Sequence, residues 1–438
     1  MIPSHLKKLS DAPVESICLH GGRIIDPANK RDEVADLYLH DGKIADPNNL
    51  PQGVNWRTID VSGQFVTPGL IDLHVHLREP GQSAKETIAT GTRAAAVGGF
   101  TTIVAMPNTT PHADSASTIA WILQRAEETA LINVYPTGCI SQKMAGELLA
   151  PIGSLVKAGV IAITDDGNCV QNNELMRRAL EYTKMFDVPI FDHCQDYNLS
   201  AGGVINEGYW STVLGLPGWP AIAEEVIVSR NAMLSELTGG VIHCQHLSSS
   251  GSVRIVREAR QRGIKISGEV MPHHIALTDG DTEGYNTNFK MNPPLRTKRD
   301  QEALLEGLSD GTIEILASDH APHCEYEKEV EFNYAPFGIL GLETELAIFI
   351  KALIDPQVLD WSDMLAKLTI NPAKLLNLDK GTLTPGKDAD VTVINPSLEW
   401  TVDKNQFQSL SRNTPFHGWE LRGRTTHTIV GGRVVYQS

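Results

Sequence analysis

Two histidines at alternate positions mark the stretch of this chain that is best suited to chemistry. His74 and His76 lie at the end of an apolar run, Leu70–Val75, within the segment TPGLIDLHVHLREPG at residues 67–81. Residues two apart on a strand face the same side, so both imidazoles can enter one cavity, as can Arg78 if the chain stays extended. An imidazole pair suits a divalent ion of the zinc type, and a guanidinium beside it suits a carboxylate or phosphate. Taken alone, such a pair is more often simply solvated at a strand end.

Further residues of the types that bind metals follow four other apolar runs. They are Asp165 with Asp166, His193, His246, and then Asp319 with His320 and His323. Each has an ordinary explanation when taken singly, such as a helix cap or a hydrogen-bonded core histidine. Their repeated position directly after apolar runs has no such explanation. It indicates that side chains from several strand ends share a metal site.

The number of these residues predicts more than one ion. Four histidines and two aspartates exceed the four ligands of a tetrahedral zinc, whereas two metals bridged by a carboxylate and a hydroxide would use all six. Such a pair lowers the pKa of the bridging water and clamps a carbonyl oxygen during attack. An aspartate beside it can act as general base and return the proton to a leaving nitrogen. The chemistry indicated is hydrolysis, or its reverse, at an amide-type carbon.

The elements that must position these residues alternate between apolar strands and helices over residues 68–380. The predicted strands are Leu70–Val75, Thr101–Ala105, Asn133–Thr137, Val160–Thr164, Pro189–Asp192, Val241–Gln245, Lys265–Val270 and Ile313–Ala317. The predicted helices are Ala84–Val97, Ser115–Glu128, Asn173–Phe186, Ala221–Leu237, Ser252–Arg262 and Lys298–Leu308, with a less clear connection around Pro151 and Gly153. This alternation predicts an α/β fold, a parallel (β/α)8 TIM barrel. A doubly wound open sheet is the alternative, but no glycine-rich dinucleotide loop follows any strand.

Both ends of the chain have the pattern of short strands instead. Near the N-terminus we expect two short strands meeting at Gly21-Gly22, a hairpin around Asp41-Gly42, and a strand over Arg57–Val66 broken at Ser62-Gly63. Near the C-terminus, Asp390–Ile394 predicts a strand and Thr426–Tyr436 a hairpin turning at Gly431-Gly432. We therefore predict a small composite β-sandwich domain made of residues 1–67 and 381–438, with the barrel domain of residues 68–380 inserted between them.

Composition excludes several classes of partner. The formal net charge of −16 argues against nucleic acid and against an anionic membrane surface, and no apolar run approaches the roughly 20 residues of a membrane span. The N-terminal stretch MIPSHLKKLS has too few apolar residues for a signal peptide. The 6 cysteines show no Cys-x-x-Cys spacing and are expected to be free thiols. We expect a cytoplasmic protein that acts on a small molecule.

Nine ordered segments spread over nearly the whole chain resemble the dihydroorotases, in the branch of the cyclic amidohydrolase superfamily that lacks a carboxylated lysine. They are PGLIDLHVHLREPG, GGFTTIVAMPNTTP (98–111), TDDG (164–167), DHC (192–194), MPHH (271–274), MNPPLRT (291–297), ASDHAPH (317–323), APFGILGLET (335–344) and NTPF (413–416). The resemblance implies a barrel with a composite β-sandwich, in agreement with the strand pattern. It also implies the reversible cyclisation of N-carbamoyl-L-aspartate to L-dihydroorotate in pyrimidine synthesis.

The resemblance assigns a role to each candidate residue. One Zn2+ would be held by His74, His76 and Asp319, a second by His193 and His246, and Asp166 would bridge the two ions. No lysine follows the fourth strand, so the bridging carboxylate must come from Asp165 or Asp166, and Asp166 is favoured. Asp319 would also be the catalytic base. Substrate-binding residues implied by the resemblance are His76, Arg78, Asn108, Asn292, His323, Phe337 and Gly338.

Some features depart from the family or stay open. Asp192 replaces a small residue and either orients His193 or, as we favour, points away across the strand. Gln195 stands where the family generally has Glu. The charged run from Glu325 to Tyr334 is expected to line the site as a mobile loop or else to be solvated. None of these features removes a metal ligand.

Two other functions remain as alternatives, and assembly is also open. A hydantoinase or allantoinase would share the barrel but usually carries the bridging lysine. A catalytically inactive scaffold for aspartate transcarbamoylase would typically have lost the histidines that this chain retains. We expect a homodimer, with association with aspartate transcarbamoylase as a further possibility.

Overall fold

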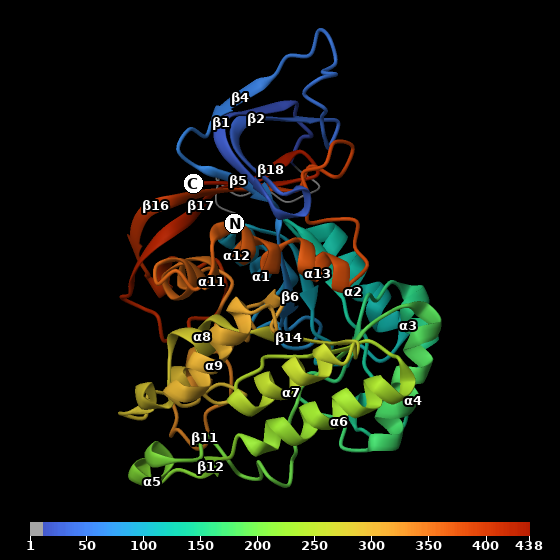
Figure 1. Ribbon diagram of the computed structural model, residues 1–438, viewed down its shortest axis with the longest axis vertical. Helices are drawn as coiled ribbons and strands as arrows, with labels where there is room; N and C mark the ends of the chain where they lie inside the picture. The colour runs from blue at the N-terminus through green and yellow to red at the C-terminus, as the bar shows by residue number, and fades with distance from the viewer. Residues whose placement is uncertain (1–11) are drawn as a thin grey trace.

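Eight parallel strands form a closed barrel at the centre of the computed structural model, which describes residues 12–438 (Figure 1). They are β6 (Leu70–Val75), β7 (Phe100–Ala105), β8 (Asn133–Pro136), β9 (Ile163–Thr164), β10 (Ile190–Asp192), β13 (Ile242–Cys244), β14 (Ile266–Val270) and β15 (Ile315–Leu316). Strands β6, β7 and β8 form one hydrogen-bonded group, and β9, β10, β13, β14 and β15 form another. Parallel bridges Gly138–Ile163 and Val75–His320 join the two groups. The predicted barrel is confirmed, and its closure excludes the open doubly wound sheet.

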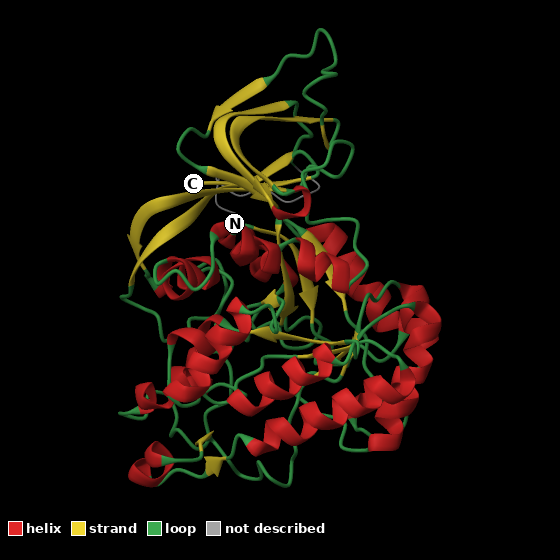
Figure 2. Ribbon diagram, viewed as in Figure 1, coloured by secondary structure: helices red, strands yellow, loops and turns green. Residues whose placement is uncertain are grey.

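Helices surround the strands and make the outer layer (Figure 2). The main ones are α1 (Ile88–Gly98), α2 (Ala116–Thr129), α3 (Ile152–Ala158), α4 (Asn173–Thr183), α6 (Ile222–Thr238), α7 (Ser250–Gln261), α9 (Lys298–Ser309), α12 (Trp361–Leu368) and α13 (Ile370–Leu375). The first begins at Ile88 rather than Ala84 because the Thr87 hydroxyl caps it by accepting from the Thr90 N–H. Helix α3 was not predicted, since Pro151 and Gly153 interrupt its pattern. Pro151 in fact precedes the first turn, where its missing N–H costs nothing.

Several shorter elements complete the described part of the chain. They are β11 (Ile205–Asn206), β12 (Gly218–Trp219), α5 (Tyr209–Leu214), α8 (Pro272–Ala276), α10 (Glu325–Lys328) and α11 (Glu345–Phe349). No helix within residues 12–438 combines the length and apolar character that crossing a membrane requires. All six cysteines are free thiols, as predicted.

The two ends of the chain meet in one eight-stranded sheet, drawn as blue and red strands side by side in Figure 1. Its strands are β1 (Ile17–Asp26), β2 (Arg31–His40), β3 (Lys43–Ile44), β4 (Arg57–Asp60), β5 (Phe65–Pro68), β16 (Val391–Thr401), β17 (Glu420–Val430) and β18 (Arg433–Gln437). Antiparallel pairing of β5 with β16 joins the termini. The composite β structure and its hairpins are confirmed, but the two strands expected around Gly21-Gly22 are one strand. A register shift between Leu19 and Gly22 absorbs the glycines as a bulge. Residues 1–11, which belong to the predicted N-terminal β region and carry the MIPSHLKKLS stretch, lie outside the described part.

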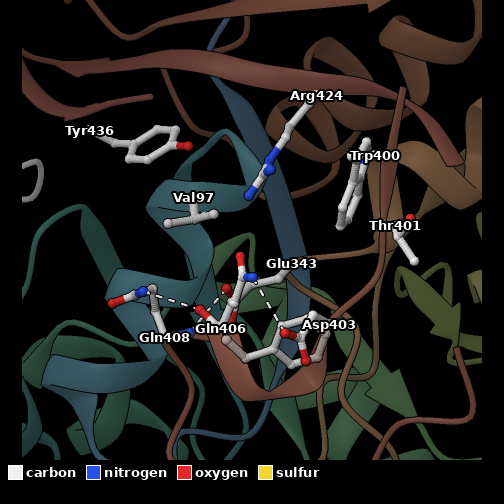
Figure 3. Close-up of a pocket in the computed structure, with 10 residues that line it drawn as sticks. Val97, Glu343, Trp400, Thr401, Asp403, Gln406, Gln408, Arg424 and Tyr436 are labelled. Atoms are coloured by element: carbon white, nitrogen blue, oxygen red, sulfur yellow. Dashed lines mark hydrogen bonds between the residues drawn. The ribbon is translucent and has the colours of Figure 1, made fainter. Parts of the chain in front are cut away.

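A cavity of about 330 Å³ lies where this sheet meets the barrel (Figure 3). The Arg424 guanidinium lies over the Trp400 ring, 4.8 Å from its centroid. The Glu343 carboxylate accepts hydrogen bonds from the backbone N–H groups of Gln408 and Ser409. These bonds connect the segment that contains Gln408 and Ser409 to the barrel. None of the residues predicted to do chemistry lines this cavity.

The loops after β6 and β7 pack closely against each other at Gly81. It has φ +90°, and a Cβ there would lie 1.9 Å from the Thr110 carbonyl oxygen, whereas Gly311, at φ +80°, has open space. We expect Gly311→Ala to show only the cost of the left-handed backbone, about 1–2 kcal/mol. Gly81→Ala should lose a further ~1–3 kcal/mol from overlap with backbone. Differential scanning calorimetry of both variants measures this, and equal melting temperatures would contradict the packing.

Candidate metal centre and active site

The strand ends of the barrel frame a cavity of about 180 Å³. Every residue predicted to bind substrate lines it: His76, Arg78, Asn108, Asn292, His323, Phe337 and Gly338. So do four of the predicted metal ligands besides His76, namely Asp166, His193, His246 and Asp319. His74 has 0% exposure and lies below the floor of the cavity. The fold thus brings together residues that are up to 264 positions apart in the chain, from His74 to Gly338 (338 − 74).

One group of ligand atoms forms where β6 meets the loop after β15. His76 Nε2 lies 3.1 Å from Asp319 Oδ1, and His74 Nε2 lies 3.6 Å from the same oxygen. The backbone N–H of His76 donates to the His320 carbonyl, which holds these two segments side by side. His74, His76 and Asp319 therefore form a buried set that can hold one metal ion.

A second group surrounds Asp166 at the end of β9. Its Oδ1 lies 3.3 Å from His74 Nε2, 3.8 Å from His246 Nε2 and 3.7 Å from His193 Nδ1. Its Oδ2 lies 3.3 Å from His76 Nε2. His193 Nδ1 and His246 Nε2 are 2.7 Å apart, so both rings turn a nitrogen toward the same point. The two oxygens of Asp166 thus face both groups of histidines.

The neighbouring Asp165 has a different environment. Its carboxylate accepts hydrogen bonds from the backbone N–H groups of Ile140 and Ser141 and from the Ser141 hydroxyl. Those contacts anchor the loop after β8, and they leave no oxygen of Asp165 directed at the histidines. Of the two aspartates, the geometry favours Asp166 as the residue shared between the groups.

Asp166 Oδ1 supplies the test of whether these residues fit a metal. It is buried, and no donor in the described part of the chain forms a hydrogen bond with it. A buried charged oxygen without a partner costs several kcal/mol unless a cation approaches it. Nitrogen and oxygen ligands at this spacing are what a divalent ion of the zinc type requires. The donor set and the unsatisfied oxygen therefore fit a bound metal.

The protonation states of Asp166 and His193 agree with that fit. Although burial favours the protonated form of Asp166, the imidazoles of His74, His246 and His76 hold the pKa of this carboxyl well below its usual range. Burial and the nearby His246 lower the pKa of His193 to about 4. At neutral pH the first group is thus a carboxylate and the second a neutral imidazole, the forms that bind metals.

Glu269 on β14 is a part of the site that sequence reasoning missed. Its Oε1 lies 2.6 Å from His74 Nδ1, and its Oε2 lies 3.3 Å from His243 Nε2. Accepting the Nδ1–H of His74 leaves Nε2 of that ring free to face the cavity. The available signal was a glutamate within a predicted strand that is buried along its whole length.

His76 receives similar support from the loop after β7. Its Nδ1 lies 2.9 Å from Asn108 Oδ1, and Asn108 Nδ2 lies 3.5 Å from the Asp166 carbonyl oxygen. The amide oxygen has no hydrogen, so His76 donates through Nδ1 and turns Nε2 toward the carboxylates. Asn108, predicted only as a substrate contact, also orients a candidate metal ligand.

Arg78 reaches the cavity by a route that differs from the prediction. The strand ends at Val75, and Arg78 has φ +58°, so the chain is not extended at this residue. Arg78 is 8% exposed, and its guanidinium donates from Nε to the Pro322 carbonyl and lies 3.5 Å from His323 Nε2. No carboxylate among residues 12–438 lies within 4.0 Å of it. It is a buried cation that lacks an anionic partner.

Asp192 and Gln195, which depart from the family pattern, have different surroundings. Asp192 points outward, where its carboxylate accepts from Arg230 and Asn231 of α6, so it does not orient His193. Gln195 lies beside His193, with its Oε1 2.9 Å from His193 Nε2.

The charged run at residues 325–334 does not line the cavity, contrary to one of the two expectations. It starts with α10, and the buried Lys328 ammonium donates to the carbonyls of Pro336 and Gly338. These bonds hold the turn at Phe337, whose carbonyl accepts from His323 Nε2. The run therefore supports the wall of the cavity from behind.

Comparison with known proteins gives concordant results. A family model described as "Dihydro-orotase-like" matches residues 63–252, and one described as "Amidohydrolase family" matches residues 230–435. A dihydroorotase of Syntrophus aciditrophicus is 49% identical over 96% of this chain and 99% of its own length. One from Pelotomaculum thermopropionicum is 50% identical over 96% and 98%.

Solved structures of related enzymes share the fold. An L-hydantoinase (dihydropyrimidinase) from Arthrobacter aurescens has a TM-score of 0.86 at 25% identity, covering 97% of this chain and 96% of its own. A dihydropyrimidinase from Brevibacillus agri has a TM-score of 0.85 at 23% identity, covering 96% and 95%, which shows the fold alone.

The support that Glu269 gives His74 predicts a measurable loss of metal affinity. In Glu269→Gln, the weaker acceptor no longer fixes the Nδ1–H form of His74, and changes of this kind cost about 10–100-fold in affinity. Competition of the purified variant with a chelator measures the loss. Glu314→Gln is the matched control, because Glu314 pairs with Arg260 at the opposite end of the barrel strands. Unchanged affinity in Glu269→Gln would contradict this role.

Proposed function

The chain belongs to the dihydroorotase family of the amidohydrolases, and from this premise we propose that it interconverts N-carbamoyl-L-aspartate and L-dihydroorotate in pyrimidine synthesis. The observation that supports this substrate is Arg78. Its buried guanidinium, which pairs with no acidic side chain within the described range, forms one wall of a small cavity, and it is 3.5 Å from a second candidate contact, His323. A substrate carboxylate is the partner that this cation lacks.

We propose two zinc ions as the cofactor. His74, His76 and Asp319 would hold one, His193 and His246 the other, and Asp166 would bridge them. When bound, such ions lower the pKa of a water molecule and polarise a carbonyl oxygen. The unsatisfied Oδ1 of Asp166 and the convergent imidazole nitrogens support this assignment.

The chain's own residues then carry binding and proton transfer. Arg78 and Asn108 would hold the substrate carboxylate, while Asn292, His323 and the backbone at Phe337-Gly338 would hold the rest of the ring. Asp319 would take a proton from the attacking water at a carboxylate oxygen and deliver it to the ring nitrogen as the C–N bond breaks. The reverse sequence closes the ring. Burial of these groups excludes bulk water, so each charge interaction is stronger than in solution.

A hydantoinase or allantoinase is the second candidate, supported by the shared fold of the solved hydantoinases. Those substrates do not need a carboxylate-binding arginine, and the fourth strand of this chain has no lysine at its end. An inactive scaffold is less well supported, since all of the candidate ligands are present and buried together.

We further propose that the protein is cytoplasmic and homodimeric, with aspartate transcarbamoylase as a partner to be tested. An exposed apolar row on α6, formed by Ile222, Val226, Met233 and Leu237, supports self-association. Sedimentation of the protein alone and with aspartate transcarbamoylase distinguishes these assemblies.

Activity and metal content test the proposal directly. We expect purified zinc-loaded protein to contain two zinc ions per chain and to hydrolyse dihydroorotate near neutral pH, with hydantoin and allantoin as poor substrates. Removal of zinc by a chelator should abolish turnover, and added zinc should restore it. Protein that holds zinc yet hydrolyses only hydantoin or allantoin would contradict the assignment, and protein that holds no metal would favour the scaffold.

Arg78→Ala tests the carboxylate site. Loss of a charge-assisted contact worth about 1.5–3 kcal/mol should raise KM for dihydroorotate by about 10–100-fold. The change in kcat should be smaller, because the contact is made equally in the ground and transition states. Arg178→Ala is the control, since Arg178 pairs with Glu174 and Glu181 on the surface of α4. An unchanged KM in Arg78→Ala would rule out this carboxylate site.

A further inference from the structure

Gln195 connects two parts of the site without lining the cavity itself. It follows β10, and its Oε1 lies 2.9 Å from His193 Nε2 and 3.2 Å from Asn292 Nδ2. Its Nε2 lies 2.8 Å from the Ser200 hydroxyl oxygen. One side-chain amide therefore contacts both a candidate metal ligand and a candidate substrate contact.

Ser200 fixes which way this amide points. The hydroxyl of Ser200 donates to the Asp196 carbonyl, 2.8 Å away, so its single hydrogen is already used. The oxygen of Ser200 must then accept from Gln195 Nε2. That bond places the Oε1 of Gln195, which can only accept, against His193 and Asn292.

The first consequence concerns the tautomer of His193. Because Oε1 only accepts, His193 must carry its hydrogen on Nε2 and donate it there. Its Nδ1 is then a bare acceptor, and this is the nitrogen that lies 2.7 Å from His246 Nε2 and 3.7 Å from Asp166 Oδ1. Gln195 thus leaves the nitrogen that faces the candidate metal site free to bind a cation.

The second consequence concerns Asn292. This amide must offer Nδ2 to Gln195, which turns its Oδ1 elsewhere. That oxygen is buried and has no hydrogen-bond partner among residues 12–438. A buried amide oxygen left unpaired costs about 1–3 kcal/mol, so a donor from a ligand in the cavity that Asn292 lines would satisfy it. The ring N–H or ureido N–H of the proposed substrate is a donor of this kind.

We propose that Gln195 is a positioning residue that sets the His193 tautomer for metal binding and turns Asn292 to accept a substrate N–H. The metal half rests only on the geometry of His193. The Asn292 half rests on the proposed function, because it requires a substrate with an N–H group.

Two substitutions at position 195 distinguish the hydrogen-bonding roles of the side chain from its contribution to packing. Glutamate in this place keeps the acceptor facing His193 and Asn292 but cannot donate to Ser200. Leucine removes both the acceptor and the donor. If the acceptor is what matters, Gln195→Glu retains function that Gln195→Leu loses.

The test uses the whole protein loaded with zinc and compares both variants with the parent and with Gln124→Leu. Gln124 is an exposed residue on α2 whose side-chain amide donates to Glu128, remote in sequence from the candidate ligands. For Gln195→Leu we expect zinc affinity, measured by chelator competition, to fall by about 10–100-fold. With zinc kept saturating, KM for dihydroorotate should rise by about tenfold while kcat changes less. Gln195→Glu and Gln124→Leu should stay within about threefold of the parent in zinc affinity and KM.

The outcomes separate the two halves of the proposal. Parental zinc affinity in a folded Gln195→Leu protein overturns the role toward His193, whatever the activity. Parental KM at saturating zinc overturns the role toward Asn292. If Gln195→Leu does not fold, as judged by its melting temperature, Gln195→Glu decides, since a tenfold loss of zinc affinity there overturns the acceptor role. Failure of the parent to act on dihydroorotate would overturn the proposed function and the Asn292 half, and leave the zinc measurement to judge the rest.

Discussion

The burial of the Asp166 carboxylate at the convergence of the barrel strands is the constraint on which the site depends. Its Oδ1 accepts no hydrogen bond from the residues that the structure describes, so its charge is balanced by the imidazoles around it and by whatever cation they bind. Such an arrangement is stable only if the imidazoles cannot turn away. Glu269 holds His74 from behind, and Asn108 holds His76. The hydrogen bonds that fix the orientation of these imidazoles therefore also stabilise the buried carboxylate.

The closure of the barrel creates this convergence. The bridge between Val75 and His320 joins the first strand to the segment after the last, and it sets His76 beside Asp319. The first strand is itself anchored at its other end, because β5 continues the terminal sheet directly into β6 and pairs with β16. Residues from both ends of the chain therefore determine where the first two histidines lie. This explains how a sheet remote from the cavity contributes to the geometry within it.

Much of this organisation could be predicted from the sequence, since strand cores are apolar runs and ligand residues follow them directly. What could not be predicted depends on contacts between distant residues or on local backbone geometry. Glu269 meets His74 across 195 positions, and nothing local to either residue encodes that contact. Arg78 turns through a left-handed conformation that no spacing rule anticipates. Helix α3 could not be predicted because the sequence does not distinguish a proline that precedes a helix from one that interrupts it, and Pro151 precedes α3.

The candidate metal ligands and Arg78 would set different properties of the proposed site. A pair of cations held by histidines and aspartates would suit any cyclic amide, so substrate choice must come from groups beside them. Arg78 is the group that we propose for this role, and burial lowers its pKa while the nearby Asp319 and Asp166 carboxylates oppose that effect. Its positive charge in turn favours the ionised form of Asp319. A substrate carboxylate that pairs with Arg78 would neutralise part of this field and raise the proton affinity of Asp319 when the base is required. Binding of the substrate carboxylate to Arg78 and the increase in the proton affinity of Asp319 would then have the same electrostatic cause.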